Sequence, residues 1–259
     1  MPIHIIVCIK SVIRAVPEEV TRRLPENSEL NPFDRPVLEA ALTIKATMGG
    51  SVTALSMGPP VAASALSEAK ALGVDKTVLV TDPALVGSDT LVTARVLAAA
   101  IGLVGGFDFV FFGMRSSDSD TGHVGPQTAA LLEIPFVSSI KYIKSQDCHW
   151  EIQRTIDDWE EHWEVESPAA FSISPKAFPP RHIGLMGIAE AGDQPMIKIF
   201  SLSELGLGPE VVGLAGSPTR VVALQKIKRS RTCNMIVGDP RKQVEALIEQ
   251  LNKRGAMEL

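Results

Sequence analysis

The stretch FDFVFFGMRSSDSDTGHVGPQTAA, residues 107–130, decides the fold class of this chain. It begins with a short apolar run, which is typical of a strand buried on both faces of a sheet. A polar loop rich in serine and aspartate follows, and a helix is expected near Pro126–Leu132. A strand, a polar turn and a helix in this order are typical of one βα unit of a parallel sheet.

The same alternation of strands and helices is expected on the N-terminal side of this stretch. Apolar, β-branched runs predict strands at His4–Lys10, Ser51–Ser56 and Lys76–Val80. Helical spacing predicts helices between these strands, at Pro36–Met48, Val61–Leu72 and Asp89–Ile101. The alternation predicts an α/β fold: a doubly wound, mostly parallel sheet with helices on both faces, Rossmann-like and suited to an adenine nucleotide.

The alternation of strands and helices ends after about residue 138. A short strand follows Pro135, and then Glu151–Ile156 and His162–Glu166 flank two aspartates and predict an antiparallel hairpin at the sheet edge. One more buried strand is expected at Ala169–Ser174.

The last part of the chain is poor in runs that could form a core. Residues 175–194 are rich in proline and glycine and predict a long loop, and Pro240–Arg254 predicts a charged amphipathic helix. We therefore expect a nucleotide-binding domain over residues 1–200, including a loop at 179–194, and a C-terminal arm with a helix over residues 201–259 that packs on a partner. A mobile tail is the alternative for this arm.

Composition excludes several classes of function. The 259 residues carry 25 lysines and arginines against 30 aspartates and glutamates, a net charge of −5, so no broad basic surface for nucleic acid is expected. No apolar run reaches the roughly 18 residues of a membrane span. Cys8, Cys148 and Cys233 form no CxxC pair, which predicts neither a disulfide framework nor a zinc site and favours the cytoplasm.

Small and polar residues recur where the predicted strands end. In the loop after residue 113, Gly122–Pro126 precede the free N–H groups of a helix N-terminus, a natural position for a phosphate. The carboxylates of Asp118 and Asp120 would repel phosphate, so they are interpreted as turn-fixing or ribose-binding groups. A serine- and aspartate-rich helix cap without any ligand is the alternative.

Further segments of this kind are expected at the same edge of the sheet. Asn31 and Asp34 could cap the first helix or reach into the crevice beside the first strand. Met57-Gly58 ends the second strand, and Asp89-Thr90 opens the third helix, where Asp89 as a plain N-cap is the alternative. Because the carboxyl ends of parallel strands meet at one edge, these segments are expected to face each other. No arrangement of catalytic residues stands out, so no catalytic centre is predicted.

Eight segments in a fixed order resemble the β-subunit of electron transfer flavoproteins. They are VCIK (7–10), LNPFD (30–34), LSMGPP (55–60), ALGVDK (71–76), GSDTLVTA (87–94), DSDTGHVGP (118–126), PPRHIGLMGI (179–188) and GLAGSPTRV (213–221). The resemblance implies a heterodimer with a larger α-subunit that carries the redox FAD. It also implies an adenine nucleotide in the β-subunit itself, which is AMP in most members. In electron-bifurcating members that nucleotide is a second FAD, reduced by NADH.

The resemblance also implies which residues bind. The cofactor-binding residues expected from it are Cys8, Asn31, Phe33, Asp34, Met57, Gly58, Asp89, Thr90, Asp118, Asp120, Thr121, Gly122, His123 and Val124. Leu185 matches the leucine that anchors a partner dehydrogenase, so a flavin dehydrogenase of the acyl-CoA type is the expected partner. The chain would then be an electron carrier subunit without a catalytic centre of its own.

Two departures from the family pattern keep alternatives open. The segments at 87–90 and 118–126 favour a second FAD, whereas Gln153-Arg154 and Asp157-Asp158-Trp159 replace the hairpin pieces common in bifurcating members. After the docking loop, Glu190, Gly192 and Asp193 replace a lysine run, which argues for a different dehydrogenase surface. An adenine-nucleotide-binding regulatory protein of universal-stress type is the alternative function. An ATP-pyrophosphatase-like enzyme would need a Ser-Gly-Gly loop after the first strand, which this chain lacks.

Overall fold

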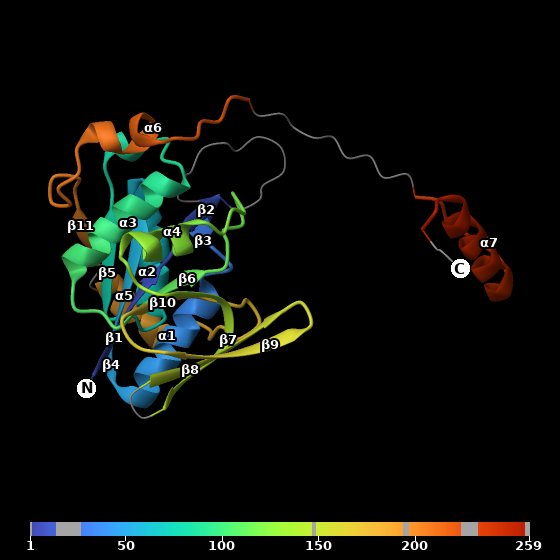
Figure 1. The fold of residues 1–259 in the computed structure, drawn as a ribbon, viewed down its shortest axis with the longest axis horizontal. Coiled ribbons are helices and arrows are strands. Elements are labelled where there is room, and N and C mark those ends of the chain that lie inside the picture. Colours follow the sequence, from blue (N-terminus) through green and yellow to red (C-terminus); the bar gives the residue numbers. More distant parts are fainter. Residues whose placement is uncertain (1, 14–26, 147–148, 194–196, 224–232, 257–259) are drawn as a thin grey trace. The chain divides into compact units, whose positions relative to one another are not determined.

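Strand β1 (Ile3–Cys8) lies in the middle of a nine-stranded sheet with the order β11-β5-β4-β1-β6-β10-β7-β8-β9 (Figure 1). The structure is a computed structural model that describes residues 2–13, 27–146, 149–193, 197–223 and 233–256. Both β4 (Gly50–Met57) and β6 (Phe109–Gly113) pair with β1 in parallel, one on each side. β5 (Lys76–Val80) continues the parallel sheet beyond β4, and β10 (Ala169–Ile173) continues it beyond β6. The predicted doubly wound sheet is confirmed.

Two layers of helices cover the sheet, and the alternation of side chains along β1 explains why both are needed. Ile5 and Val7 belong to a buried cluster with α1 (Arg35–Met48) and α2 (Ala63–Ala71). Ile6 and Cys8 point the other way, into a cluster with α3 (Thr90–Val104) and α4 (Val124–Leu131). From Ile5 to Cys8 every position of β1 is apolar and buried, as expected for a strand in a sheet that is covered on both faces.

The antiparallel hairpin at the sheet edge is confirmed as well. β7 (Phe136–Gln146) pairs in parallel with β10 and then in antiparallel with β8 (His149–Ile156), which pairs with β9 (Trp159–Val165). β7 is longer than the short strand expected after Pro135, because it serves both the parallel sheet and the hairpin. Trp150 fastens the hairpin to the core through an edge-to-face contact with Phe109, with 4.8 Å between ring centroids.

The long loop expected over residues 175–194 is partly wrong. The segment contains α5 (Leu185–Asp193), and β11 (Ile197–Phe200) follows and pairs in parallel with β5. The glycines at 187 and 192 weaken the intrinsic helical tendency of α5 and hide it in the sequence. Tertiary packing on α2 overrides that tendency, because Gly187 lies so close to Ala71 that a Cβ would collide with the Ala71 carbonyl oxygen.

The remaining described elements are short. They are β2 (Ser11–Ile13), β3 (Ser28–Leu30), η2 (Pro60–Ala62), η3 (Pro83–Leu85), η4 (Pro209–Val211) and α6 (Gly213–Gly216). Residues 1–220 form one compact unit, and residues 221–259 form a second that contains the expected amphipathic helix α7 (Pro240–Lys253). No helix among the described residues is long and apolar enough to cross a membrane.

Candidate nucleotide-binding site

The fold places a reversal of strand order at the carboxyl end of β1, where a doubly wound sheet is expected to form a ligand-binding crevice. After β1 the chain builds β4 and β5 on one side, and it then returns to build β6 on the other side. In doubly wound sheets, ligands bind outside the carboxyl ends of the strands where the strand order reverses in this way. The loops after β1, before α1 and after β6 meet at this point.

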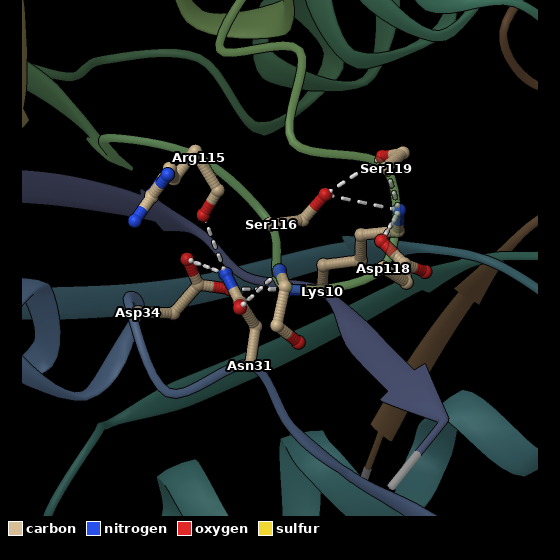
Figure 2. A network of polar contacts seen from close by, with 8 residues as sticks. Lys10, Asn31, Asp34, Arg115, Ser116, Asp118 and Ser119 are labelled. Atoms are coloured by element: carbon tan, nitrogen blue, oxygen red, sulfur yellow. Dashed lines mark hydrogen bonds and ion pairs between the residues drawn. The ribbon is translucent and has the colours of Figure 1, made fainter. Parts of the chain in front are cut away.

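Asn31 ties these three segments together (Figure 2). Its Nδ2 donates to Asp34 Oδ1 at 2.9 Å and to the Arg115 carbonyl oxygen at 3.0 Å. Its Oδ1 accepts the backbone N–H of Ser117 at 3.2 Å, and its own N–H donates to the Lys10 carbonyl oxygen at 2.9 Å. Asn31 therefore fixes the strand end, the start of α1 and the loop after β6 in one arrangement.

Asp34 stands at the N-cap position of α1, but its side chain turns toward β1. Its Oδ2 accepts the backbone N–H of Lys10 at 2.7 Å. Burial raises the pKa of Asp34 to about 7, against the opposing effect of the hydrogen bonds from Lys10 and Asn31. The expected alternative of simple capping is therefore wrong for Asp34.

The close packing around Asp34 also determines the residue type at Gly113 and the properties of Cys8. A Cβ at Gly113 would collide with the Asp34 carboxylate, so only glycine fits at the end of β6. Cys8 is buried, and burial, with a smaller contribution from the Asp34 charge, raises the pKa of its thiol far above the usual range. Cys8 is thus an unreactive thiol that packs in the buried cluster with α3 and α4.

Lys10, whose binding role no sequence motif indicates, reaches over the loop after β6. Its Nζ lies 2.7 Å from Asp118 Oδ1, 3.3 Å from Ser119 Oγ and 3.4 Å from Ser116 Oγ (Figure 2). The two serine hydroxyls are 2.8 Å apart. A lysine just past the central strand is the signal that could have identified this residue.

A second cation pairs with the other carboxylate of the loop. Arg115 Nη1 lies 3.0 Å from Asp120 Oδ1, and the guanidinium lies 4.7 Å from the centroid of the Phe33 ring. Because Lys10 pairs with Asp118 and Arg115 with Asp120, the two carboxylates do not leave the loop with a net negative charge. The expected repulsion of phosphate is thereby removed.

The loop then bends into α4 through left-handed backbone. Asp120 and Gly122 have φ of 54° and 64°, and a Cβ at Gly122 would lie 3.1 Å from the Met114 carbonyl oxygen. Within the residues that the structure describes, the first N–H groups of α4 receive no capping bond from the His123 side chain. Thr121 and His123 are exposed, and Val124 packs against the core. Available N–H donors beside two cations fit the phosphates of a nucleotide.

The other expected residues divide into two groups. Met57 is the last residue of β4, which lies next to β1, and Gly58 follows it, so both lie at the same edge of the sheet. Asp89 is the N-cap of α3, where Oδ1 accepts the Val92 N–H at 3.0 Å. Its Oδ2 accepts the N–H and hydroxyl of Thr219, at 3.0 and 2.8 Å, so Asp89 fastens a C-terminal segment to α3, of which the adjacent Thr90 is the first residue. The N-cap alternative for Asp89 is confirmed.

Within the described ranges, no cluster of three or more His, Cys, Asp or Glu side chains is placed to hold a metal ion. Leu185 is the first residue of α5 and is 85% exposed, and the neighbouring Met186 and Ile188 are exposed too. Leu185 therefore lies on an exposed helical ridge.

Comparison with known proteins gives a consistent picture. Residues 22–204 match the family model described as "Electron transfer flavoprotein domain". The electron transfer flavoprotein subunit beta of Thermoanaerobacterium thermosaccharolyticum is 37% identical over 227 residues, 88% of this chain and 87% of the relative. Subunit CarD of the caffeyl-CoA reductase-Etf complex of Acetobacterium woodii is 38% identical, covering 84% and 86%. The acryloyl-CoA reductase electron transfer subunit gamma of Anaerotignum propionicum is 33% identical, covering 97% and 98%.

Proposed function

This chain belongs to the electron transfer flavoprotein family, as a β-subunit with a role in electron transfer, and on that premise we propose that it acts as half of a heterodimer. The other half is the α-subunit, which carries the redox FAD, while this chain holds its own adenine nucleotide. The universal-stress alternative is not favoured by these relatives. The observation that carries the proposal is the set of paired charges at the β1/β6 crevice, since it gives phosphate a neutral loop with N–H donors.

Several residues of this chain would hold the nucleotide. Lys10 and the N–H groups that follow Gly122 lie where they can meet the phosphates, and the Ser116 and Ser119 hydroxyls can add hydrogen bonds. Asn31 and Asp34 fix the backbone around the site through hydrogen bonds, and both side chains are buried. FAD supplies the acceptance and release of electrons when it is bound, and the protein positions it.

The nucleotide in this subunit is proposed to be a second FAD, with AMP as the alternative. The segments at 87–90 and 118–126 support FAD, because the family carries these pieces in its bifurcating members. With a second FAD, the complex would also oxidise NADH. The altered hairpin at residues 153–159 supports AMP.

The redox partner is proposed to be a flavin enzyme that acts on acyl-CoA compounds. Two relatives support this by their names, one from a caffeyl-CoA reductase complex and one from acryloyl-CoA reductase. The exposed ridge that begins at Leu185 is the proposed docking site, because exposed apolar residues in a group mark interaction surfaces. The expected cytoplasmic location stays a proposal that rests on the cysteine pattern.

The nucleotide identifies the function most directly. The heterodimer is purified, its bound nucleotides are released by denaturation, and mass spectrometry counts FAD and AMP per complex. Two FAD, with reduction of the flavin by NADH, would support the bifurcating form. One FAD and one AMP per complex would establish a simple electron carrier. One FAD and no second nucleotide per complex would refute the proposal.

A further inference from the structure

The segment that leads into α5 is fastened to α1 by one arginine. Arg181 Nε lies 2.7 Å from Glu39 Oε2, and Arg181 Nη2 lies 2.9 Å from Glu39 Oε1. The backbone N–H of Arg181 also donates to Glu39 Oε2, at 3.1 Å. The contact joins residues 142 positions apart in the chain and fixes both the side chain and the backbone of the segment.

The geometry distinguishes this contact from an ordinary surface ion pair. The guanidinium meets the carboxylate with two parallel hydrogen bonds, a form that adds directional specificity to charge attraction. The Glu39 side chain is only 15% exposed, and the Thr43 hydroxyl donates to its Oε1 at 3.2 Å. Hydrogen bonding by Arg181 lowers the pKa of Glu39 below its usual value, so the carboxylate stays charged.

Other residues of the segment point inward on either side of Arg181. Phe178 and Ile183 pack against the buried cluster beneath α1 and α2. Gly187 lies against the end of α2, where a Cβ would collide with the Ala71 carbonyl oxygen. Between these attachment points, Leu185 and Met186 face outward and are exposed. The described part of the segment is thus packed against α1 and α2 on one side, while Leu185 and Met186 face solvent on the other.

We propose that Arg181 is a positioning residue for partner docking: its paired hydrogen bonds to Glu39 hold residues 181–188 so that Leu185 and Met186 present a preformed ridge. The proposal rests on the docking role of Leu185. A ridge that is already ordered loses less conformational entropy when a partner binds, so affinity rises without any new contact. Loss of the arginine therefore weakens docking and leaves the electron-transfer step itself unchanged.

Steady-state electron transfer from the intact αβ complex to its flavin dehydrogenase gives the KM for the dehydrogenase and kcat. Arg181→Ala is expected to raise KM about tenfold with kcat unchanged, a change of about 1.4 kcal/mol in docking. Arg181→Lys keeps the charge but loses the two parallel bonds, so KM should be intermediate. The exchange Arg181→Glu with Glu39→Arg should recover part of the loss. Hydrogen exchange of the amides at 182–190 should be faster in Arg181→Ala.

Lys45→Ala is the matched control, because Lys45 also makes an ion pair from α1, at 2.6 Å, but its partners are Asp75 and the Gly73 carbonyl oxygen rather than residues 181–188. It should change neither KM nor the exchange rates. A normal KM in Arg181→Ala, while Leu185→Ala raises KM, would overturn the positioning proposal and leave the docking site intact. A normal KM in both variants would overturn the docking role and the positioning proposal together. Equal effects of Arg181→Ala and Lys45→Ala would also overturn it, since they would show a general loss of stability.

Discussion

Among single residues, Asp34 is one whose pKa burial raises into the neutral range. Its pKa is raised to about 7, whereas an aspartate in an unfolded chain titrates near 3.9. Between these values the folded protein binds a proton that the unfolded chain has lost. The free energy of unfolding therefore falls as pH rises from about 4 to 7, and the contribution of the protonated form is lost above that pH.

Asp34→Asn should remove this pH dependence. Across pH 5 to 8, the melting temperature of the wild-type complex should fall relative to that of the variant, because only the wild type must release a buried proton. The full difference between the two pKa values corresponds to on the order of 4 kcal/mol. Thermal melts of both proteins in the same buffers measure the effect. Parallel curves for the two would show that Asp34 is ionised throughout.

Gly122 is the residue at which the phosphate loop is most sensitive to a side chain. Gly122→Val should lower the nucleotide content, because the side chain would crowd Met114 and strain a left-handed backbone by about 1–3 kcal/mol. Gly106→Val is the control: Gly106 has a similar φ of 55°, and no described atom lies within 4 Å of its added Cβ. Nucleotide per complex, measured after denaturation, should fall only in the first variant. Equal losses in the two would point to general strain.

The sequence predicted the site residues that lie in motifs or at the ends of expected strands. It did not predict which of these residues form ion pairs or hydrogen bonds with each other. Asn31, Asp34, Asp118 and Asp120 stand at the ends of predicted elements and could be expected at one edge. The partners Lys10 and Asp118 are 108 positions apart, so their contact depends on the strand order around β1. Asp89 is expected at the nucleotide from the family resemblance, because its actual partner Thr219 lies 130 positions away and is not visible in the sequence.

At the scale of elements, the presence of helix α5 where a loop was expected changes the interpretation of Leu185. A leucine at a loop tip would be mobile, whereas Leu185 begins a helix that packs on α2. Most strands and helices were predictable because apolar runs and helical spacing persist over several turns or residues. The α5 helix was not, since glycine at 187 lowers local propensity and the packing that compensates for it lies outside the segment.

Leu185→Ala should slow electron transfer to the dehydrogenase at limiting dehydrogenase concentration. The loss of an apolar anchor at an interface costs about 2 kcal/mol or more, roughly a thirtyfold loss of affinity. Flavin content and melting temperature should stay nearly unchanged, because the side chain is 85% exposed. Leu103→Ala, at an exposed leucine near the end of α3, is the control. A fall in transfer that merely tracks a lower melting temperature would show that Leu185 packs on its own subunit.

At the scale of the whole molecule, large apolar side chains are exposed on two elements, β9 and α7. On the hairpin, Trp159 is 75% exposed and Trp163 is also exposed. On α7, Val244, Leu247 and Ile248 form an exposed apolar stripe with helical spacing. Large exposed apolar groups of this kind mark surfaces that a partner covers. The sequence indicated this through the few core-forming runs in the C-terminal part, but it could not name the hairpin tryptophans as exposed.

The central claim is that this chain works as the nucleotide-holding half of a flavin-containing heterodimer. Co-expression with its α-subunit, followed by size-exclusion chromatography with mass and absorbance detection, tests it most directly. The account predicts a yellow complex of one α-subunit and one copy of this chain, and poorly soluble or flavin-free protein when the chain is expressed alone. A stable, monodisperse monomer with its own visible flavin spectrum, and no association with the α-subunit, would contradict the account.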